Sequence, residues 1–585
     1  MILQCLFSLD LMSWLIGIFL LLLLVDIIKN KNPSNFPPGP RPLPFVGNIF
    51  TGLHFRTIDK LAEEYGEIFS LRWGSEKMVF ISGHKMVKEA LVTQLDSFAD
   101  RPIIPLFHPF FKGLGVILSN GYLWKMQRKF TNIYLRNFGE AKKNFERSIQ
   151  QESIFLCEAF KLEKGPFNPQ FYVNHAIANI VSAAVFGHRF EYHDERFHTV
   201  LRLDSEALVL SGSVRAQLYN AFPRLFSFVP GPHQKVFANY GKITDFLRDE
   251  IKKHKEDFDP SNPRDFIDAY LIEMEKKSSD PEAGFNIETL VVTTLDIIEA
   301  GTEASASTIR WGLLFMMKHP EIQKKVQEEI DRVIGHSRQP NMADKPNMPY
   351  TDAVIHEIQR AGNTVPLGFP KRASRDATLG GYFIPKGTAV STNLSSLLND
   401  KTEWETPDTF NPGHFLDEQG QFRKRDIFLP FSAGRRVCIG EPLARIELFL
   451  IFTSLLQRFT FTPGPGEKLS MDGLLGFIYV PSPYLIYGQG LSFSNGYSWR
   501  KQQQFDVSHL KNFGEGKKTL EHHIKQECHF LCEAFTEEQV LDYLKNKPPL
   551  NFPPGPFAVP FLGNIFNINL KEPRIYLTKI RCRKR

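Results

Sequence analysis

The chain has 585 residues, of which 42% are hydrophobic and 13% aromatic, so it can bury a large core and is not an intrinsically disordered protein. Its net charge of +6 is small for this length and gives no indication of a nucleic-acid partner. The six cysteines are too few for a disulfide scaffold and none form a zinc-like CxxC pair, which favours a reducing compartment.

The N-terminal segment LMSWLIGIFLLLLLVDII, residues 11–28, is close to the roughly 20 apolar residues that cross a bilayer as a helix. A cleaved signal peptide is the alternative, but no small-residue cleavage site follows; KNKN and the linker PSNFPPGPRPLP come next. Because lysines follow the span and no Lys or Arg precedes it, the rest of the chain is expected in the cytosol. We therefore predict a membrane anchor over residues 1–28 and a proline-rich hinge over residues 29–50.

Between about residues 55 and 460 the pattern is mostly helical. Apolar residues recur three and four apart in 319–335 and 350–362, and 288–317 reads as one long apolar helix with small and polar residues at 300–308. Strand signals are fewer and include 77–83 and 381–393. The predicted fold class is mainly α with a small β part.

The stretch FSAGRRVCIG, residues 431–440, places Cys438 in a glycine-rich loop directly before an apolar helix. A lone buried cysteine is usually a small hydrophobe, and that is the interpretation for Cys157. At Cys438 a nearby arginine and the N-terminus of the following helix favour a thiolate. With no second Cys or His nearby, a metal bound here must bring its other ligands, as haem iron does.

This loop fits the FxxGxRxCxG signature, and the chain resembles the cytochrome P450 haem-thiolate monooxygenases. Further motifs in the expected order are ExxR at 357–360, FNPGHF at 410–415, WKMQR at 124–128 and AGTE at 300–303. The resemblance covers roughly residues 25–487 and is nearest to family 2, subfamily J. It implies the cytochrome P450 fold, with a haem-thiolate catalytic domain over residues 51–488.

The resemblance also implies roles for individual residues. Cys438 is the expected axial ligand of the iron of haem b. Glu357 and Arg360 are the expected structural ion pair, although without the other motifs a solvated surface pair would be the default interpretation. The expected contacts of the haem propionates are Arg101, Trp124, Arg128, Lys371 and Arg436.

In the family, the long helix crosses the oxygen side of the haem, and its AGxET box supplies an acid and an alcohol that relay protons. Here Glu303 is present, but Ala304 stands in place of the threonine. The candidate catalytic residues are therefore Glu303, Thr302 and Ser305. Poor proton delivery would release peroxide, so the alternative to a monooxygenase is a poorly coupled or peroxide-rearranging haem-thiolate protein.

The implied reaction inserts one atom of O2 into an apolar substrate, with electrons from NADPH through cytochrome P450 reductase and with cytochrome b5 as a further partner. The implied location is the endoplasmic reticulum membrane. The segments 106–117, 207–212 and 364–369 offer apolar linings. Subfamily resemblance indicates polyunsaturated fatty acids such as arachidonate, or xenobiotics. A basic face for the reductase is offered by Lys125, Lys129, Arg136, Arg423, Lys424, Arg425 and Arg435.

The C-terminal tail, residues 489–585, contains two partial duplicates. Residues 494–535 repeat 119–160 and residues 541–566 repeat 25–50, in the wrong order and without a second cysteine loop. We expect a tail without haem that is either disordered or an artefact of the gene model. A third hypothesis is a haem-free binding protein disabled by this tail.

Overall fold

The computed structural model of the chain describes residues 11–140 and 142–490, and the description below concerns these residues. The two repeats of the tail lie outside them. The helices of the described part are α2 (Leu11–Lys29), α3 (Phe55–Tyr65), α4 (His84–Lys88), α5 (His108–Phe111), α6 (Gly121–Glu140), α7 (Lys142–Leu162), α8 (Gln170–Val185), α9 (Glu195–Ser211), α10 (Val214–Ala221), α11 (Pro223–Phe226), α12 (Pro232–Glu256), α13 (Phe266–Lys276), α14 (Ile287–Lys318), α15 (Pro320–Val333), α16 (Pro349–Gly362), α17 (Leu394–Leu398) and α18 (Glu441–Arg458).

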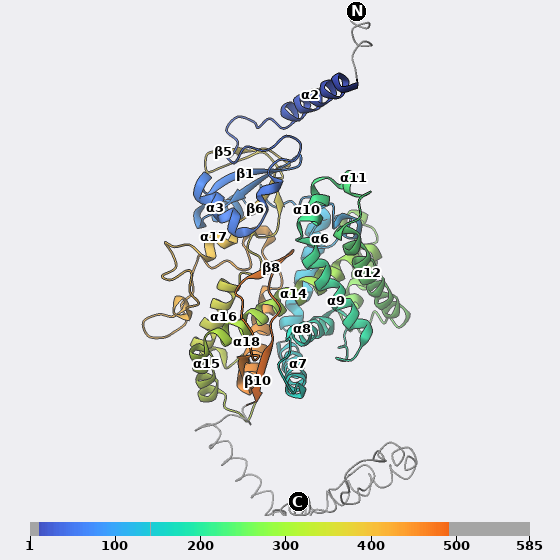
Figure 1. Cartoon of the computed structure of the whole chain (residues 1–585). Coiled ribbons are helices and arrows are strands. Elements are labelled where there is room, and N and C mark those ends of the chain that lie inside the picture. The colour runs from blue at the N-terminus through green and yellow to red at the C-terminus, as the bar shows by residue number, and fades with distance from the viewer. Residues whose placement is uncertain (1–10, 141, 491–585) are drawn as a thin grey trace, which may run out of the picture. The chain divides into compact units, whose positions relative to one another are not determined.

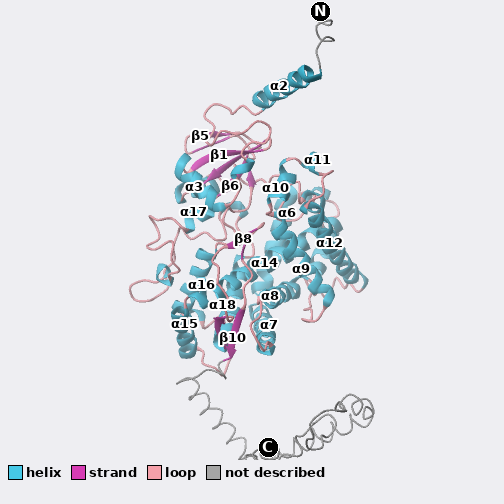
Figure 2. Ribbon diagram, in the orientation of Figure 1, coloured by secondary structure: helices cyan, strands magenta, loops and turns pink. Residues whose placement is uncertain are grey.

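The strands form one four-stranded sheet and three two-stranded sheets (Figure 2). The larger sheet has the order β1-β2-β6-β3, in which β2 and β6 run parallel and the other pairs antiparallel. The smaller sheets pair β4 with β5, β8 with β9 and β7 with β10. The strands are β1 (Ile68–Trp73), β2 (Glu76–Ile81), β3 (Lys371–Arg372), β4 (Ala377–Leu379), β5 (Tyr382–Ile384), β6 (Ala389–Thr392), β7 (Phe459–Pro463), β8 (Gly473–Leu475), β9 (Tyr479–Pro481) and β10 (Ile486–Gly490).

The mainly α prediction is confirmed, and the three helices that it named are α14, α15 and α16. The long helix α14 begins where the Asn286 side chain accepts a hydrogen bond from the N–H of Thr289, and it ends before Pro320 opens α15. Residues 77–83 contribute to β2, and residues 381–393 form β5 and β6. The last strand, β10, continues to Gly490, two residues beyond the predicted end of the catalytic domain.

The helix α14 is the centre of the fold, and it contacts α8, α12, α16 and α18 (Figure 1). Its C-terminal half packs into a core shared with α7, α8, α15, α16 and α18. Its N-terminal half packs into a second core with α9, α12 and α13. A helix that is apolar all round must be buried on every side, and α14 is buried over most of its length.

The N-terminal helix α2 is long and apolar enough to span a membrane, and none of it is buried in the protein. Its last turn is tied to the globular part through Asp26, whose carboxylate lies 3.1 Å from a guanidinium nitrogen of Arg72 on β1. The same carboxylate accepts a hydrogen bond from the N–H of Phe45. Residues 30–48 therefore form a short connection that returns to the first sheet.

Candidate functional site

The loop before α18 holds Cys438 through tight backbone contacts. The N–H of Cys438 donates to the carbonyl of Phe431 at 3.1 Å. Gly434 has φ of +77°, and a Cβ there would lie 1.9 Å from the carbonyl oxygen of Leu91, so only glycine fits. The short helix Gly434–Arg436 then turns the chain, and α18 starts three residues after the cysteine.

The thiol of Cys438 is accessible to solvent, whereas that of Cys157 is buried. Desolvation raises the pKa of the Cys438 thiol, but the N–H groups of Gly440 and Glu441 and the charge of Arg128 act in the opposite direction. Burial raises the pKa of Cys157 to about 12, which makes it inert. Of these two cysteines, only Cys438 is an accessible sulfur with donors that favour a thiolate.

Four cationic side chains gather near this loop. Arg128 donates to the carbonyl of Val437 at 2.5 Å, one residue before the cysteine. Arg436 donates to the carbonyls of Ala99, at 2.8 Å, and Ser119, at 2.7 Å. Arg101 donates to the carbonyls of Ile117, Phe369 and Pro370. Lys371 donates to the carbonyl of Phe369 and to the hydroxyl of Thr392.

The four cations are crowded and lack counter-ions in the part of the chain that the structure describes. Burial and the neighbouring arginines lower the pKa of Arg101 to about 9, that of Arg436 to about 8 and that of Lys371 to about 7. Within residues 11–140 and 142–490, none of the four forms an ion pair with a carboxylate. Buried charges are normally paired, so this arrangement suits an anionic group.

Trp124 extends the cationic cluster. The guanidinium carbon of Arg436 lies 3.8 Å from the centre of its ring, and that of Arg128 lies 5.7 Å away. The side chain is buried, yet its indole Nε1–H has no partner among the described residues. A buried donor without an acceptor is costly and calls for a ligand.

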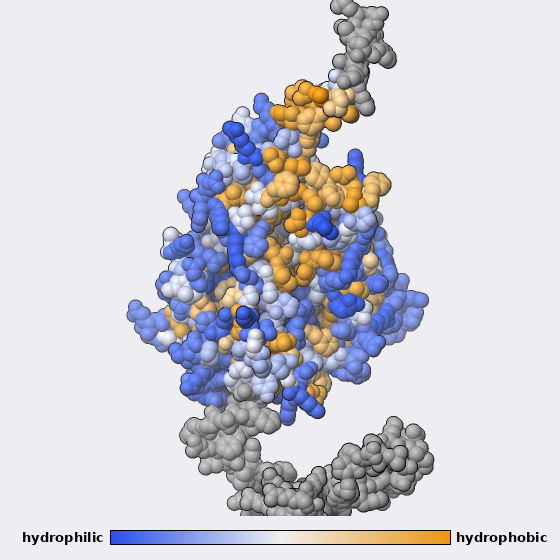
Figure 3. All heavy atoms as spheres, viewed as in Figure 1, coloured by the Kyte–Doolittle hydropathy of each residue, from blue (hydrophilic) through white to orange (hydrophobic). Residues whose placement is uncertain are grey.

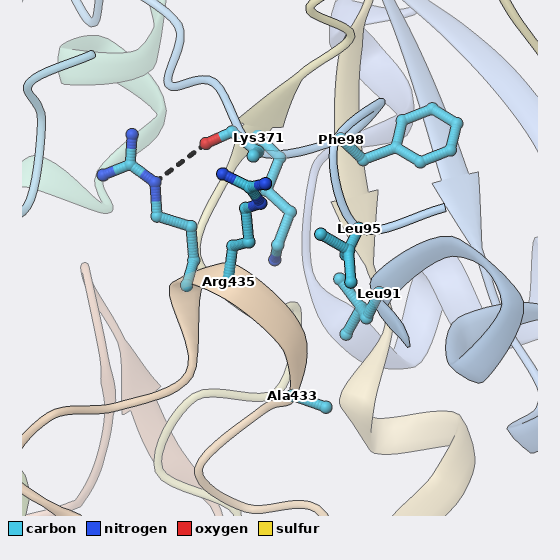
Figure 4. Close-up of a pocket in the computed structure, with 8 residues that line it drawn as sticks. Leu91, Leu95, Phe98, Lys371, Ala433 and Arg435 are labelled. Carbon is cyan, nitrogen blue, oxygen red and sulfur yellow. Dashed lines mark hydrogen bonds between the residues drawn. The ribbon is translucent and has the colours of Figure 1, made fainter. Parts of the chain in front are cut away.

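A small pocket lies beside the cluster, and Figure 4 shows Lys371 and Arg435 at it with Leu91, Leu95 and Phe98. Arg435 forms an ion pair with Asp96. Arg435 therefore differs from the four unpaired cations.

Glu357 and Arg360 form a bidentate ion pair with N–O distances of 2.8 and 2.7 Å, and both side chains are completely buried. The remaining guanidinium donors bind the carbonyls of Leu398, Pro407 and Thr409. Glu357 in turn accepts from the N–H of Asn411 and contacts His414. The pair therefore holds the segment 398–414 that leads to the cysteine loop. The sequence did not predict its bonds to the carbonyls of Leu398, Pro407 and Thr409.

The predicted relay residues point in different directions. Glu303 accepts hydrogen bonds from Asn174, at 2.8 Å, and from Ser205, and burial raises its pKa. Ser305 donates to Glu447 on α18 at 2.8 Å. The hydroxyl of Thr302 is buried without a partner among the described residues.

Between residues 289 and 317 of α14, four residues are not fully buried: Ile297, Ala300, Gly301 and Ala304. Their spacing of three and four puts them on one side of the helix, and we call this side the open face. Thr302, Glu303 and Ser305 lie off this face. The open face thus carries no acid and no hydroxyl at these four positions.

The predicted apolar segments 106–117, 207–212 and 364–369 all contact Phe477, a residue that the sequence analysis did not predict for this site. Its ring centre lies 5.1 Å from that of Phe107 and 4.6 Å from that of Phe369. Its N–H donates to the carbonyl of Leu208. No local motif marks this residue, because only the folding of the C-terminal segment brings it to the other three.

Comparison with known proteins identifies the family. The family model described as Cytochrome P450 matches residues 37–487. Human cytochrome P450 2J2 is 49% identical over 472 residues, which cover 80% of this chain and 94% of that protein. Rat cytochrome P450 2J3 is 48% identical over 455 residues, with coverage of 77% and 90%, and rat cytochrome P450 2G1 is 44% identical over 470 residues, with coverage of 79% and 95%. The chain therefore belongs to the cytochrome P450 family, as a haem monooxygenase that resembles family 2 and, among these relatives, has the higher identity to subfamily J.

Proposed function

We propose that the chain is a membrane-anchored haem-thiolate monooxygenase with Cys438 as the axial ligand of haem b. One observation carries the proposal: the accessible Cys438 thiol lies in a hydrogen-bonded loop beside four cations, three of them buried, and none of the four pairs with a carboxylate among the described residues. The haem, when bound, supplies dioxygen activation by an iron whose thiolate ligand favours O–O cleavage.

The residues present fit this group. Haem b carries two propionate carboxylates, and Arg101, Arg128, Lys371 and Arg436 offer the missing counter-charges. The unpartnered Nε1–H of Trp124 offers a further donor. Glu357 and Arg360 would support the site indirectly, by fixing the segment that leads to the cysteine loop.

An apolar substrate is supported by the meeting of Phe107, Phe369 and Phe477. Large aromatic side chains supply most of the contact area in such sites. Polyunsaturated fatty acids such as arachidonate, epoxidised or hydroxylated, are the first substrate class to test, and apolar xenobiotics are the second.

Electrons would come from NADPH through cytochrome P450 reductase, with cytochrome b5 as a second candidate donor. In the proposed basic face, Lys125 and Lys129 are exposed on α6. Arg423 and Arg425 instead pair with Glu405, at 3.2 and 3.1 Å. The α6 lysines are therefore better candidates for contacting an acidic partner.

The endoplasmic reticulum membrane is the proposed location, with residues 1–28 as the anchor, 29–50 as the hinge and the catalytic domain in the cytosol. Figure 3 shows apolar surface on α2 and on the neighbouring surface below it. Exposed apolar residues outside α2 include Phe50, at 82%, and Phe228, at 88%. Contiguous apolar surface next to a membrane-spanning helix suits lipid contact.

The second candidate function, a poorly coupled or peroxide-rearranging protein, is favoured by Ala304 on the open face. The two candidates differ in where NADPH electrons go. Turnover of arachidonate with NADPH and reductase, set against peroxide release, separates them.

The reduced, CO-bound absorption spectrum tests the haem site itself. We expect the Soret band typical of haem-thiolate proteins in the unaltered chain and its loss in Cys438→His. A band that survives the substitution would contradict the ligand assignment, and its absence from the unaltered chain would favour the haem-free hypothesis.

A further inference from the structure

The open face of α14 lacks the hydroxyl that the family's proton relay uses, because residue 304 is alanine. Hydroxyl side chains are nevertheless frequent nearby: Thr302, Ser305, Ser307 and Thr308. The structure distinguishes them by the direction in which each side chain points and by its partner.

Three of these hydroxyls are held away from the open face. Ser305 donates to Glu447 on α18. Ser307 is completely buried and lies 3.4 Å from a guanidinium nitrogen of Arg310. Thr302 is buried at 1% exposure, and although its hydroxyl has no partner among the described residues, its position lies off the open face.

Thr308 is also buried, at 7% exposure, but it differs in position, because it lies one turn after Ala304 on the same side of the helix. Its Oγ1 donates to the carbonyl oxygen of Ala304 at 2.8 Å. Oγ1 of Thr308 also lies 3.3 Å from Oγ1 of Thr364. Thr364 is a partly exposed residue of the predicted apolar lining 364–369. The two hydroxyls and the Ala304 carbonyl thus form a short polar chain along an apolar wall.

We infer that Thr308, backed by Thr364, serves as the hydroxyl of proton delivery in place of the missing threonine at position 304. The inference rests on the proposed monooxygenase function. A hydroxyl can receive a proton on one lone pair while it gives up its own, so the pair can pass a proton from water at Thr364 toward the open face. For this the Thr308 hydroxyl has to rotate away from the Ala304 carbonyl.

The reaction fixes what such a relay must do. Productive turnover consumes O2, two electrons from NADPH, two protons and a substrate C–H bond; one oxygen atom enters that bond and the other leaves as water. When proton delivery is poorly directed, the same two electrons and two protons leave with both oxygen atoms as hydrogen peroxide, and the substrate is unchanged. The ratio of peroxide to product therefore reports the relay.

The test compares Thr308→Val, which removes the hydroxyl and keeps the shape, with Thr308→Ser, which keeps the hydroxyl. Ser307→Ala is the matched control, because it removes a neighbouring hydroxyl that is buried off the open face. The full-length proteins are assayed with haem, reductase, NADPH and arachidonate. We expect Thr308→Val to raise the peroxide-to-product ratio by about tenfold, Thr308→Ser and Ser307→Ala to leave it unchanged, and Ala304→Thr to restore it in the Thr308→Val background.

A second readout needs no turnover. The C–O stretching frequency of the reduced CO complex responds to hydrogen-bond donors close to the bound CO, so we expect it to shift in Thr308→Val and not in Ser307→Ala. Thr364→Val removes the other hydroxyl of the Thr308–Thr364 pair, and we expect it to shift the C–O frequency in the same direction.

The inference is overturned if Thr308→Val changes neither the peroxide ratio nor the C–O frequency. A raised KM with an unchanged peroxide ratio would also overturn it, since that result assigns Thr308 to substrate binding. Failure of the proposed function looks different: the unaltered chain would then lack the haem-thiolate CO spectrum.

Discussion

The hydroxyl of Ser305 on α14 donates a 2.8 Å hydrogen bond to Oε2 of Glu447 on α18. Both side chains are buried, at 5% and 4% exposure. The bond ties the central helix to the helix that follows the cysteine loop. It also engages a hydroxyl that the sequence offered as a substitute for the missing threonine.

Burial raises the pKa of Glu447 to about 7. Because this pKa lies above that of the unfolded chain, the native state binds the proton more tightly. The stability that Glu447 contributes is complete below the ordinary glutamate pKa and is lost as the pH rises through about 7. Glu447→Gln keeps a hydrogen-bonding amide without the titration, so the thermal midpoints of variant and unaltered protein should agree near pH 4. At pH 8 the variant should be more stable, by about 3 kcal/mol.

Glu328→Gln is the control for that measurement, because Glu328 is exposed on α15 at 63%. As a substitution at an exposed site, it should change the thermal midpoint much less than Glu447→Gln does at pH 8. A Glu447→Gln variant that is less stable at pH 8 would mean that the carboxylate is ionised and paired in the native state.

The buried pair Glu357–Arg360 should be the most sensitive ion pair of the catalytic domain. Arg360→Met leaves the Glu357 carboxylate and three carbonyls without their donor, at a cost of about 3–5 kcal/mol. Lys324→Met, in an exposed α15 pair, should cost less than about 1 kcal/mol. Thermal unfolding and the yield of haem-loaded protein measure both variants, and equal effects would refute the special role of the buried pair.

Haem retention should depend on Lys371 and on pH. Crowding by Arg101 and Arg436 and, above all, burial lower the pKa of Lys371 to about 7. A bound anion would raise that pKa, so haem binding takes up a proton and its affinity should fall as the pH rises above about 7. Lys371→Gln should bind haem more weakly at pH 6, and its affinity should change less with pH near 7. Haem transfer to an acceptor protein measures both effects, and Lys85→Gln, at an exposed position on α4, is the control.

Ala304→Thr should raise the product formed per NADPH and lower peroxide release. The open face has room for the larger side chain, since Ala304 is only partly buried. General acid catalysis sets an upper limit of about 10² on the gain, and Thr308 should reduce it, since it already supplies part of the relay. Unchanged coupling in this variant would show that proton delivery is already complete.

Truncation after Leu491 should leave haem incorporation, soluble yield and turnover intact or improved, because the described domain ends with β10. Truncation after Leu485 should fail. That cut removes Ile486, which is fully buried, pairs with Pro463 and exchanges two backbone hydrogen bonds with Phe167. A loss of function on the longer truncation would mean that the tail is an accessory module.

The cysteine loop was readable from sequence because its constraints are local. Gly434, Arg436 and Cys438 lie within five residues. Position 434 tolerates no Cβ, so it must be glycine, and that requirement is visible in the sequence. The helices α14, α15 and α16 were readable for a similar reason: apolar spacing and proline or asparagine at their ends reflect short-range geometry.

The sequence by itself determined the mainly α fold, the apolar N-terminal helix and the cysteine loop, since each depends on residues that are close in the chain. Only the tertiary structure decided which cations lack counter-ions, that Phe477 joins three distant segments, and which hydroxyl of α14 lies on the open face. One turn of helix places hydroxyls on every side. Which side is open depends on the elements packed around it, such as α8 and α18, and these come from more than a hundred residues away in either direction.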